Sequence, residues 1–450
     1  MRIKGKAYIN TIGCQMNVYD SEKLAGILNA YGYEKTKDVD TADLVLCNTC
    51  SIRHKAEEKA FSFLGRFARE KKRRPGLITI MAGCVAQQEG EKAFGRLPHL
   101  DIVLGTQAFA RLGTHLDALA AGKRRIVDTA ESDVIFEAMP DETAFDETAI
   151  SKFVTIMQGC ENFCTYCVVP YTRGRERSRN HAAIVEEITR LSESGIKEVT
   201  LLGQNVNSYG VKDGDISFPE LLEKVSRVEG IQRIRFATSH PKDLSQELIE
   251  AMRDIDKVCN HLHLPVQSGA NAVLKKMNRG YTRETYLARI ADLKAACPDM
   301  ALSTDIIVGF PSETQADFQD TMDLLRTVEF DSIFAFAYSD RSSAPAAKFP
   351  NQLPEAVKMA RLNQLLTLQE TYTEKKNQAL IGRDVKVLVE GESAKQREGF
   401  DHTDMKQMFG RSETNKIVHF PSNQAVIGDL VTIRIENAYP HSLWGQVSGS

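Results

Sequence analysis

The sequence predicts an α/β multidomain protein made of an N-terminal parallel-sheet domain, a central partial (β/α)6 barrel and a small C-terminal β-barrel. Short apolar runs alternate with helical patterns in two series, over residues 1–125 and 151–374, as in parallel βα units. An acidic, irregular stretch at 126–150 separates them and is interpreted as a linker. Short strand patterns with Gly and Asn turns occupy 375–450, which is typical of a small β-barrel.

Composition narrows the class of protein before any motif is considered. The 450 residues are 42% hydrophobic and 26% charged, which is ordinary for a soluble globular chain. No run of about 18 apolar residues and no signal-peptide core is found, so we expect a cytoplasmic protein with no membrane association. The nine cysteines are then reduced thiols, which favours metal binding or catalysis over a disulfide framework. The net charge of -3 excludes a protein that is basic as a whole and binds nucleic acid for that reason. Positive charge is confined to local basic runs.

In the N-terminal series, three of the apolar runs end in a cysteine. The expected strands are 6–14, 43–50, 76–84 and 101–105. Cys14, Cys50 and Cys84 stand where the first three of these patterns end. Ligands of open α/β sheets bind outside the carboxyl ends of the strands, so we expect these three thiols to gather at one site.

The central series predicts the strands of a barrel whose mouth is rich in polar groups and thiols. The expected strands are 152–158, 198–203, 232–238, 261–266, 302–309 and 332–338. Barrel active sites are built on the loops that follow the strands. Here those loops begin with Cys160, Gln204, Ser239, Gln267, Phe310 and Ser339.

The loop after the first barrel strand, QGCENFCTYC, places Cys160, Cys164 and Cys167 in a C-x3-C-x2-C spacing. A structural zinc site needs four closed ligands, whereas three thiolates on a cubane iron–sulfur cluster leave one iron open for substrate. The spacing alone does not exclude zinc or chance.

With its barrel context, this loop resembles the signature of radical S-adenosylmethionine enzymes. The resemblance implies that the open iron of a 4Fe-4S cluster chelates S-adenosylmethionine. It also implies that an electron from the cluster cleaves the cofactor to a 5′-deoxyadenosyl radical, which abstracts a hydrogen atom. It places Tyr166 beside the cofactor adenine. The cofactor-binding residues expected are Tyr166, Gln204, Asn205, Gln267, Asp305, Val308 and Phe310.

Further motifs resemble the methylthiotransferases within that superfamily. NTIGCQMN, CNTCSIRHKAEEK and AGCVAQ surround the N-terminal thiols, and LLGQNVNSYG, HLHLPVQSGANAVLKKMNRGYT and TDIIVGFPSET lie in the barrel. The resemblance covers about residues 3 to 447. It implies that Cys14, Cys50 and Cys84 bind a second 4Fe-4S cluster that handles the inserted sulfur, and that the C-terminal barrel is an RNA-binding TRAM-like domain.

Within the family, CNTCSIRHKAEEK and GRSETNKIVHF are most similar to the branch that adds a methylthio group to C2 of isopentenyladenosine in tRNA. In that branch S-adenosylmethionine serves as radical source and as methyl donor. The expected partners are the anticodon stem-loop, a reducing protein such as a flavodoxin or ferredoxin, and a sulfur donor, with the enzyme acting as a monomer. The expected RNA-binding residues are Arg173, Arg175, Arg177, Arg179, Arg411 and Asn415.

Other interpretations stay open at this stage. The family also includes enzymes acting on threonylcarbamoyladenosine in tRNA and on an aspartate of a ribosomal protein. An iron–sulfur or zinc RNA-binding protein without catalysis, and a radical enzyme for a small molecule, are the alternatives from other classes.

Several residues with possible chemistry are interpreted as structural. Cys47 is expected to be a buried strand residue, Cys259 and Cys297 small core or surface residues, and His261 and His263 packing residues. The family's barrel motif has an acidic residue one position before Glu313, so no cofactor role is predicted for Glu313.

Overall fold

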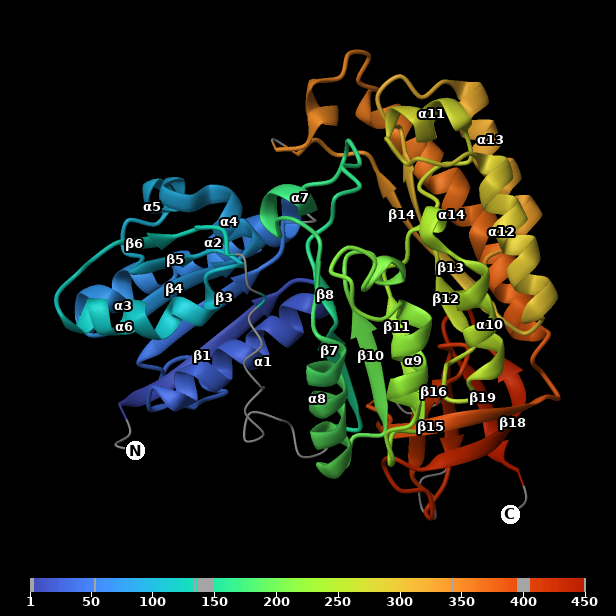
Figure 1. The fold of residues 1–450 in the computed structure, drawn as a ribbon, viewed down its shortest axis with the longest axis horizontal. Coiled ribbons are helices and arrows are strands. Elements are labelled where there is room, and N and C mark those ends of the chain that lie inside the picture. Colours follow the sequence, from blue (N-terminus) through green and yellow to red (C-terminus); the bar gives the residue numbers. More distant parts are fainter. Residues whose placement is uncertain are drawn as a thin grey trace.

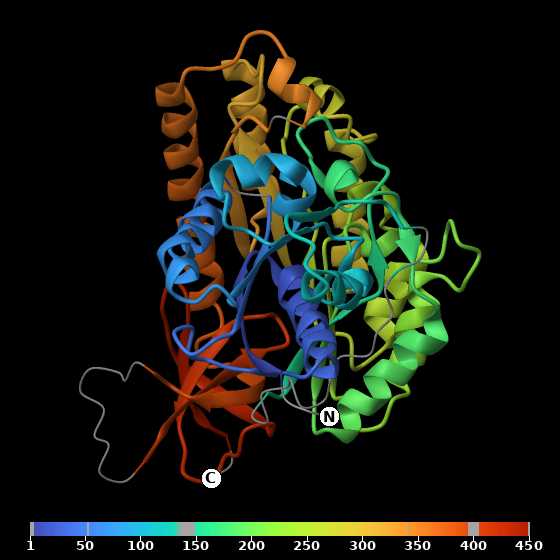
Figure 2. The same cartoon turned by 90° about the vertical axis from the view of Figure 1, so that its left-hand side faces the viewer.

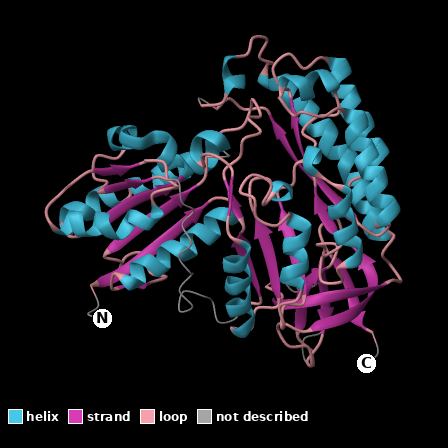
Figure 3. Ribbon diagram, in the orientation of Figure 1, coloured by secondary structure: helices cyan, strands magenta, loops and turns pink. Residues whose placement is uncertain are grey.

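The computed structural model describes residues 4–51, 54–132, 135, 149–341, 343–394 and 405–448. Its parts are a parallel-sheet domain, an incomplete barrel and a small closed barrel, which lie at the left, centre and lower right of Figure 1. Figure 3 shows the same arrangement by secondary structure, with helices on both sides of the N-terminal sheet and along the outside of the central barrel. The predicted fold class is confirmed.

The N-terminal domain is a parallel sheet in the order β2-β1-β3-β4-β5-β6. Its strands are β1 (Gly5–Ile12), β2 (Tyr33–Lys35), β3 (Leu44–Thr49), β4 (Ile78–Gly83), β5 (Ile102–Leu104) and β6 (Ile126–Asp128). Its helices are α1 (Gln15–Ala30), α2 (His54–Gly65), α3 (Phe67–Arg73), α4 (Cys84–Glu89), α5 (Ala93–Arg96) and α6 (Leu112–Ala120).

Both faces of this sheet are covered, which explains why every residue of β3 is buried and why its first four residues are apolar rather than alternating. Leu44 and Leu46 pack with α1 and α6 on one face, and Cys47 packs with α2 and α5 on the other. Strands β2 and β6 were not predicted from the sequence. Because β6 completes this sheet, the domain extends beyond the expected boundary at 125, and much of the expected 126–150 linker lies outside the described residues.

The central barrel is built from two parallel ladders, β11-β10-β7 and β12-β13-β14, joined by a parallel bridge between Ile234 and Val258. Its strands are β7 (Ser151–Thr155), β8 (Met157–Gln158), β9 (Arg177–Ser178), β10 (Glu198–Leu202), β11 (Arg233–Ala237), β12 (His261–His263), β13 (Ala301–Val308) and β14 (Ser332–Ala337). Its helices are α7 (Val169–Thr172), α8 (His181–Glu193), α9 (Phe218–Ser226), α10 (Gln246–Asp254), α11 (Asn271–Lys276), α12 (Arg283–Ala296), α13 (Gln315–Val328) and α14 (Glu355–Gln378).

Two expected barrel strands are shorter than the apolar runs suggest. After β7 the chain leaves the barrel ladder and β8 pairs antiparallel with β9, so the thiol loop starts from a small hairpin. In HLHLPV the ladder stops after His263, because Pro265 has no N–H to donate. Parallel pairing with β13 resumes only at the isolated bridge between Gln267 and Ile306.

The C-terminal part is a closed barrel in the order β15-β16-β17-β19-β18. Its strands are β15 (Asp384–Glu392), β16 (Gln407–Ser412), β17 (Ile417–Pro421), β18 (Leu430–Ala438) and β19 (Leu443–Val447). It docks against the amino ends of the central strands, where Arg233 donates to the carbonyl of Arg411 and Arg235 to that of Ser412. Figure 2 shows it below the central barrel, on the far side from the loops that follow the strands. In the described part of the chain, no helix combines the length and apolarity that a membrane crossing requires.

Candidate active site

The three N-terminal thiols lie together at the carboxyl edge of the sheet. Their strands β1, β3 and β4 are neighbours in the sheet, and Cys14 caps α1 while Cys84 begins α4. Cys50 is within hydrogen-bonding reach of both other thiols. That contact lowers the pKa of Cys14 and of Cys84 to about 6 each and raises the pKa of Cys50. Cys14 and Cys84 therefore favour the thiolate, the form that binds iron, while Cys50 keeps its proton.

Two buried asparagines hold this triad in place, and the sequence analysis did not single them out. The Asn17 amide oxygen lies 3.3 Å from both the backbone nitrogen and the Sγ of Cys14. The Asn17 amide nitrogen donates to the Oδ1 of Asn48 at 3.1 Å, and Asn48 stands two residues before Cys50. Both asparagines are fully buried. The motifs NTIGCQMN and CNTC thus supply positioning groups as well as ligands.

Arg173 belongs to this site, which corrects its predicted role as a phosphate contact. Its side chain is 5% exposed and forms a 2.7 Å ion pair with Asp20 of α1. It also lies within hydrogen-bonding reach of Cys84. The buried guanidinium is directed at the thiols of the neighbouring domain and offers no surface to RNA. The positive charge of Arg173 offsets the negative charge of the thiolates.

The barrel thiols Cys160, Cys164 and Cys167 lie on a loop that is tied to the far side of the barrel mouth. Thr165 donates from its backbone to Met277 and from its hydroxyl to Lys276. Burial raises the pKa of Cys160, and that of Cys167 to about 12. Metal binding at this loop must therefore displace protons from the thiols.

Arg279 is a residue of this site that the sequence analysis missed. It is 4% exposed, and it donates to the Sγ of Cys164 at 3.4 Å and to the hydroxyl of Tyr166 at 3.3 Å. The carbonyl of Pro265 accepts a third hydrogen bond from the same guanidinium at 2.7 Å. The only signal in the sequence is its place in the motif MNRGYT.

The alternation of side chains along β13 corrects one expected cofactor contact. Val308 is fully buried and packs with the core formed with the outer helices, together with Ile306. It exposes no surface to a ligand. Phe310 follows the strand and is fully buried against Tyr338 and Phe349, in the same apolar cluster as Tyr166, so its cofactor contact stays a prediction. Ile307 faces inward and packs in the same apolar cluster as Tyr166, so it is the residue of this strand that lines the site.

The other expected cofactor residues fall into different environments. Gln204 accepts a 2.5 Å hydrogen bond from the backbone of Gly159 and donates to the Sδ of Met16, so it links the loop to the N-terminal domain. Asn205 is buried and bonded to Asp243, which leaves it a positioning role rather than a cofactor contact. Gln267 is buried with a left-handed φ of 72° at the mouth. Asp305 lies on the inner face, 3.5 Å from His263 Nε2.

Buried polar atoms without partners show where a polar ligand would fit. Thr155 Oγ1, the Asn207 amide, Ser239 Oγ and His240 Nε2 have no hydrogen-bond partner among the described residues. All belong to the ends of β7, β10 and β11 or to the loops that follow. Burial lowers the pKa of His240 to about 2, so it is a neutral imidazole. Such groups suit the hydroxyls, amine and carboxylate of a nucleoside cofactor.

Each of the two thiol sets offers three cysteine donors. No three Cys, His, Asp or Glu side chains in the described ranges are arranged to hold one metal ion. A cubane instead takes each thiolate on a different iron. The chemistry of the two donor sets therefore fits two such clusters.

The remaining arginines of the 173–179 run differ sharply in exposure. Arg179 is 1% exposed and pairs with Glu187 at 2.7 Å, so its predicted contact with RNA is wrong. The same guanidinium donates to Tyr19 of α1 and joins the first two domains. Arg175 is exposed, and Arg177 is half-buried and bonded to the carbonyl of Ser132. Both line a small hollow between the domains, and their contact with RNA stays a prediction.

Arg411 and Asn415 lie at the opposite end of the barrel from the thiols. Arg411 contacts Glu390 at 3.1 Å and Asn415 at 3.4 Å. Both line a hollow of about 670 Å³ between the C-terminal barrel and the amino ends of the central strands, which also includes His261 and Asp331. The structure does not bring these two residues together with the cysteine loop.

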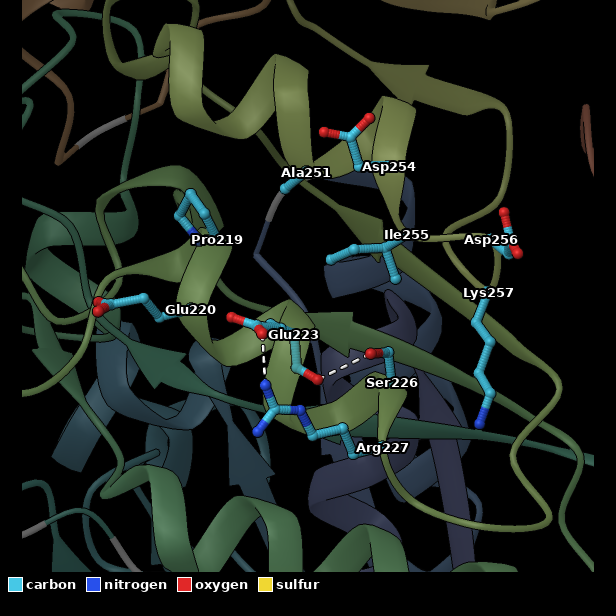
Figure 4. Close-up of a pocket in the computed structure, with 10 residues that line it drawn as sticks. All are labelled: Pro219, Glu220, Glu223, Ser226, Arg227, Ala251, Asp254, Ile255, Asp256 and Lys257. Atoms are coloured by element: carbon cyan, nitrogen blue, oxygen red, sulfur yellow. Dashed lines mark hydrogen bonds and ion pairs between the residues drawn. The ribbon is translucent and has the colours of Figure 1, made fainter.

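A further hollow of about 590 Å³ lies between α9 and α10 on the outer helical layer (Figure 4). Glu223 and Arg227 form an exposed ion pair there, and Asp254 and Lys257 line the rim. None of its lining residues is a Cys or His, and it is remote from the strand ends. It is not the active site.

Burial and hydrogen bonds confirm a structural place for the residues that were interpreted as structural. Cys47 is fully buried in the sheet core, where burial raises its pKa to about 12, and Cys259 and Cys297 are buried. His261 and His263 both contact the hydroxyl of Ser303. Glu313 is buried against Arg361 at 2.5 Å.

Family comparisons divide the chain into the same three parts. Residues 6–105 match a family described as "Uncharacterized protein family UPF0004", residues 154–325 match the "Radical SAM superfamily", and residues 378–448 match the "TRAM domain".

Three full-length relatives share one name. A tRNA-2-methylthio-N(6)-dimethylallyladenosine synthase of Desulfosudis oleivorans is 49% identical, covering 98% of this chain and 96% of the relative. Proteins of that name from Syntrophotalea carbinolica (98% and 99% covered) and Caldicellulosiruptor saccharolyticus (99% and 93% covered) are 47% and 48% identical.

Among solved structures, the fold is similar to a radical S-adenosylmethionine methyltransferase, TsrM, from Kitasatospora setae. The TM-score is 0.59 at 13% identity, over 76% of this chain and 75% of that one. The cobalamin-dependent S-adenosylmethionine radical enzyme OxsB gives a TM-score of 0.52 at 12% identity, over 82% and 56% of the two chains. At these identities the likeness shows the fold alone.

Proposed function

Because the chain belongs to the radical S-adenosylmethionine methylthiotransferases, in the branch of the tRNA-2-methylthio-N6-dimethylallyladenosine synthases, we propose that it methylthiolates C2 of N6-isopentenyladenosine next to the anticodon of tRNA. Membership in the radical superfamily implies a 4Fe-4S cluster and S-adenosylmethionine, and the TRAM domain implies an RNA substrate. The observation that carries the proposal is the pair of thiol triads on one chain. One follows a barrel strand, and the other lies at the edge of the neighbouring sheet.

The reaction requires removal of a hydrogen atom and a source of sulfur, and each triad would serve one of these requirements. C2 of adenine is an unactivated C–H carbon without an acidic proton, so acid–base chemistry gives no easy route to it. When bound, the barrel cluster and S-adenosylmethionine supply a carbon radical that removes this hydrogen, the N-terminal cluster supplies sulfur, and a second S-adenosylmethionine supplies the methyl group. Cys160, Cys164 and Cys167 would hold the first cluster, and Cys14, Cys50 and Cys84 the second.

The surrounding residues bind and orient the reactants. Tyr166, Ile307 and Gln267 would line the cofactor site, with His240 as a neutral hydrogen-bond donor, and Arg279 fixes Tyr166 beside Cys164. Arg173 lowers the cost of the buried thiolates on the other side. Arg175 and Arg177 are the exposed or half-exposed cations next to the barrel mouth, and they would contact the RNA backbone.

The partners follow from the same chemistry. A flavodoxin or ferredoxin would supply the electron, and a sulfur donor would restore the second cluster after each turnover. We expect the enzyme to act as a monomer in the cytoplasm, with its tRNA. Arg411 and Asn415 of the C-terminal barrel would contact tRNA away from the reacting base, because they lie at the far end of the central barrel.

Mass spectrometry of tRNA nucleosides from cells with and without the gene tests the substrate. Cells with the gene should contain the 2-methylthio derivative of isopentenyladenosine. Cells without it should retain isopentenyladenosine and lack the derivative. If loss of the gene removed methylthio groups only from threonylcarbamoyladenosine or from a ribosomal protein, the proposed substrate would be wrong.

A further inference from the structure

One face of α1 joins the N-terminal domain to the central barrel. The helix begins directly after Cys14, and Tyr19 and Asp20 of its second turn are 2% and 8% exposed. The Tyr19 hydroxyl donates to Glu187 of the barrel at 3.0 Å, and Asp20 pairs with Arg173 of the barrel at 2.7 Å. The helix that carries one thiol of the N-terminal triad is therefore fixed to the barrel through buried polar contacts.

Arg173 connects the two thiol sites within a few residues of chain. It directly follows α7, and its neighbour Gly174 accepts a 3.2 Å hydrogen bond from the backbone N–H of Cys160. The guanidinium of Arg173 lies within hydrogen-bonding reach of Cys84. The segment 173–174 thus contacts a thiol residue of each triad, one through the backbone and one through a side chain.

The ion pair of Arg173 and Asp20 places two opposite charges beside the same thiol. The Cys50 contact is the main cause of the lowered pKa of Cys84, but the charge of Arg173 lowers this pKa further and that of Asp20 raises it. Because the Arg173 side chain is 5% exposed, water screens its charge little. Charges and hydrogen bonds beside the sulfurs tune the reduction potential of an iron–sulfur cluster.

Resting on the proposed function, we infer that Arg173 is a positioning residue that ties the cysteine loop of the barrel to the N-terminal triad, and that its ion pair with Asp20 sets the reduction potential of the cluster held there. A buried cation stabilises the extra electron of the reduced cluster, and a buried carboxylate disfavours it. The tie also keeps the two thiol sites in register, which the joining of sulfur to the reacting carbon requires.

The test of the electrostatic role is an EPR-monitored redox titration of the N-terminal cluster. It uses full-length chains that carry Cys164→Ala, so that the barrel cluster is not held. Adding Arg173→Met should shift the midpoint potential to more negative values, because a positive charge is lost. Adding Asp20→Asn should shift it to more positive values, because a negative charge is lost. Arg173→Lys keeps the charge and should restore most of the potential of the Cys164→Ala chain.

Glu22→Gln is the matched control for Asp20→Asn. Glu22 lies on the same helix and pairs with Lys152 at 2.7 Å across the same interface. Lys152 is near the start of β7, however, whereas the cysteine loop follows the other end of that strand. Loss of this carboxylate should leave the potential close to that of the Cys164→Ala chain.

The test of the positioning role uses the holoenzyme with both clusters and the prenylated anticodon stem-loop. Arg173→Met should form about tenfold more 5′-deoxyadenosine per methylthio base than the wild type, because the loop is no longer tied to the triad. Glu22→Gln should keep the wild-type ratio.

Two results would overturn the inference and leave the proposed function standing. One is a shift of the potential in the same direction by Arg173→Met and Asp20→Asn, since both would then act only by loosening the interface. The other is a wild-type product ratio in Arg173→Met. If the wild type held a single cluster and converted no prenylated RNA, the proposed function would fail and the inference with it.

Discussion

Replacing Cys164 by alanine is expected to abolish both cleavage of S-adenosylmethionine and formation of the methylthio nucleoside. The thiol is 7% exposed in the barrel loop and is directly contacted by Arg279. Without it the barrel cluster loses one of its three protein ligands. After anaerobic reconstitution, iron should fall from about eight to about four atoms per chain, because the N-terminal cluster is unaffected. Chemical reduction with dithionite followed by chromatography measures cofactor cleavage.

Cys297→Ala is the control for the loss of a buried thiol, since Cys297 is 8% exposed and belongs to neither triad. It should keep its iron and its activity. A Cys164→Ala protein that retained about eight iron atoms and cleaved the cofactor would contradict the ligand assignment. Zinc bound in place of iron in the wild type would contradict it equally.

Replacing Cys50 by alanine should separate the two half-reactions. The variant should keep reductive cleavage of S-adenosylmethionine, because the barrel loop is intact, but it should form no methylthio product. Cys50 lies within reach of both Cys14 and Cys84, so its loss removes the central member of the triad. Iron should again fall to about four atoms per chain. Product analysis and cofactor cleavage are measured on the same reaction.

Cys47 provides the matched control, because it lies on β3 three residues before Cys50 and is fully buried in the core. Cys47→Ala should keep both clusters and both activities, at the cost of a small cavity. If Cys47→Ala lost the second cluster while Cys50→Ala kept it, the assignment of the N-terminal ligands would be reversed.

The gathering of the three N-terminal thiols at one edge of the sheet could be predicted because strand ends are visible in the sequence. Cys14, Cys50 and Cys84 each end an apolar run, and parallel strands bring such ends to one edge. The sequence could not show that Cys14 and Cys84 flank Cys50, because this follows from the order of β1, β3 and β4 in the sheet.

The predictions that failed concern side chains whose burial and orientation depend on tertiary packing. Val308 and Ile307 are adjacent apolar residues, and only the register of β13 shows that Ile307 faces inward. Arg173 and Arg179 belong to an exposed-looking basic run, yet both are buried. Arg173 pairs with Asp20, 153 residues away in the sequence, and Arg179 pairs with Glu187 of α8. Arg279 follows Cys164 by 115 residues, so nothing local connects them.

The most direct test of the central claim follows one hydrogen atom. A tRNA carrying isopentenyladenosine with deuterium at C2 is incubated with the reconstituted enzyme and S-adenosylmethionine. The account predicts that the deuterium appears in 5′-deoxyadenosine, with one molecule of S-adenosylhomocysteine formed for each 2-methylthio base. Deuterium released only to solvent, or a 2-methylthio product formed without labelled 5′-deoxyadenosine, would contradict it.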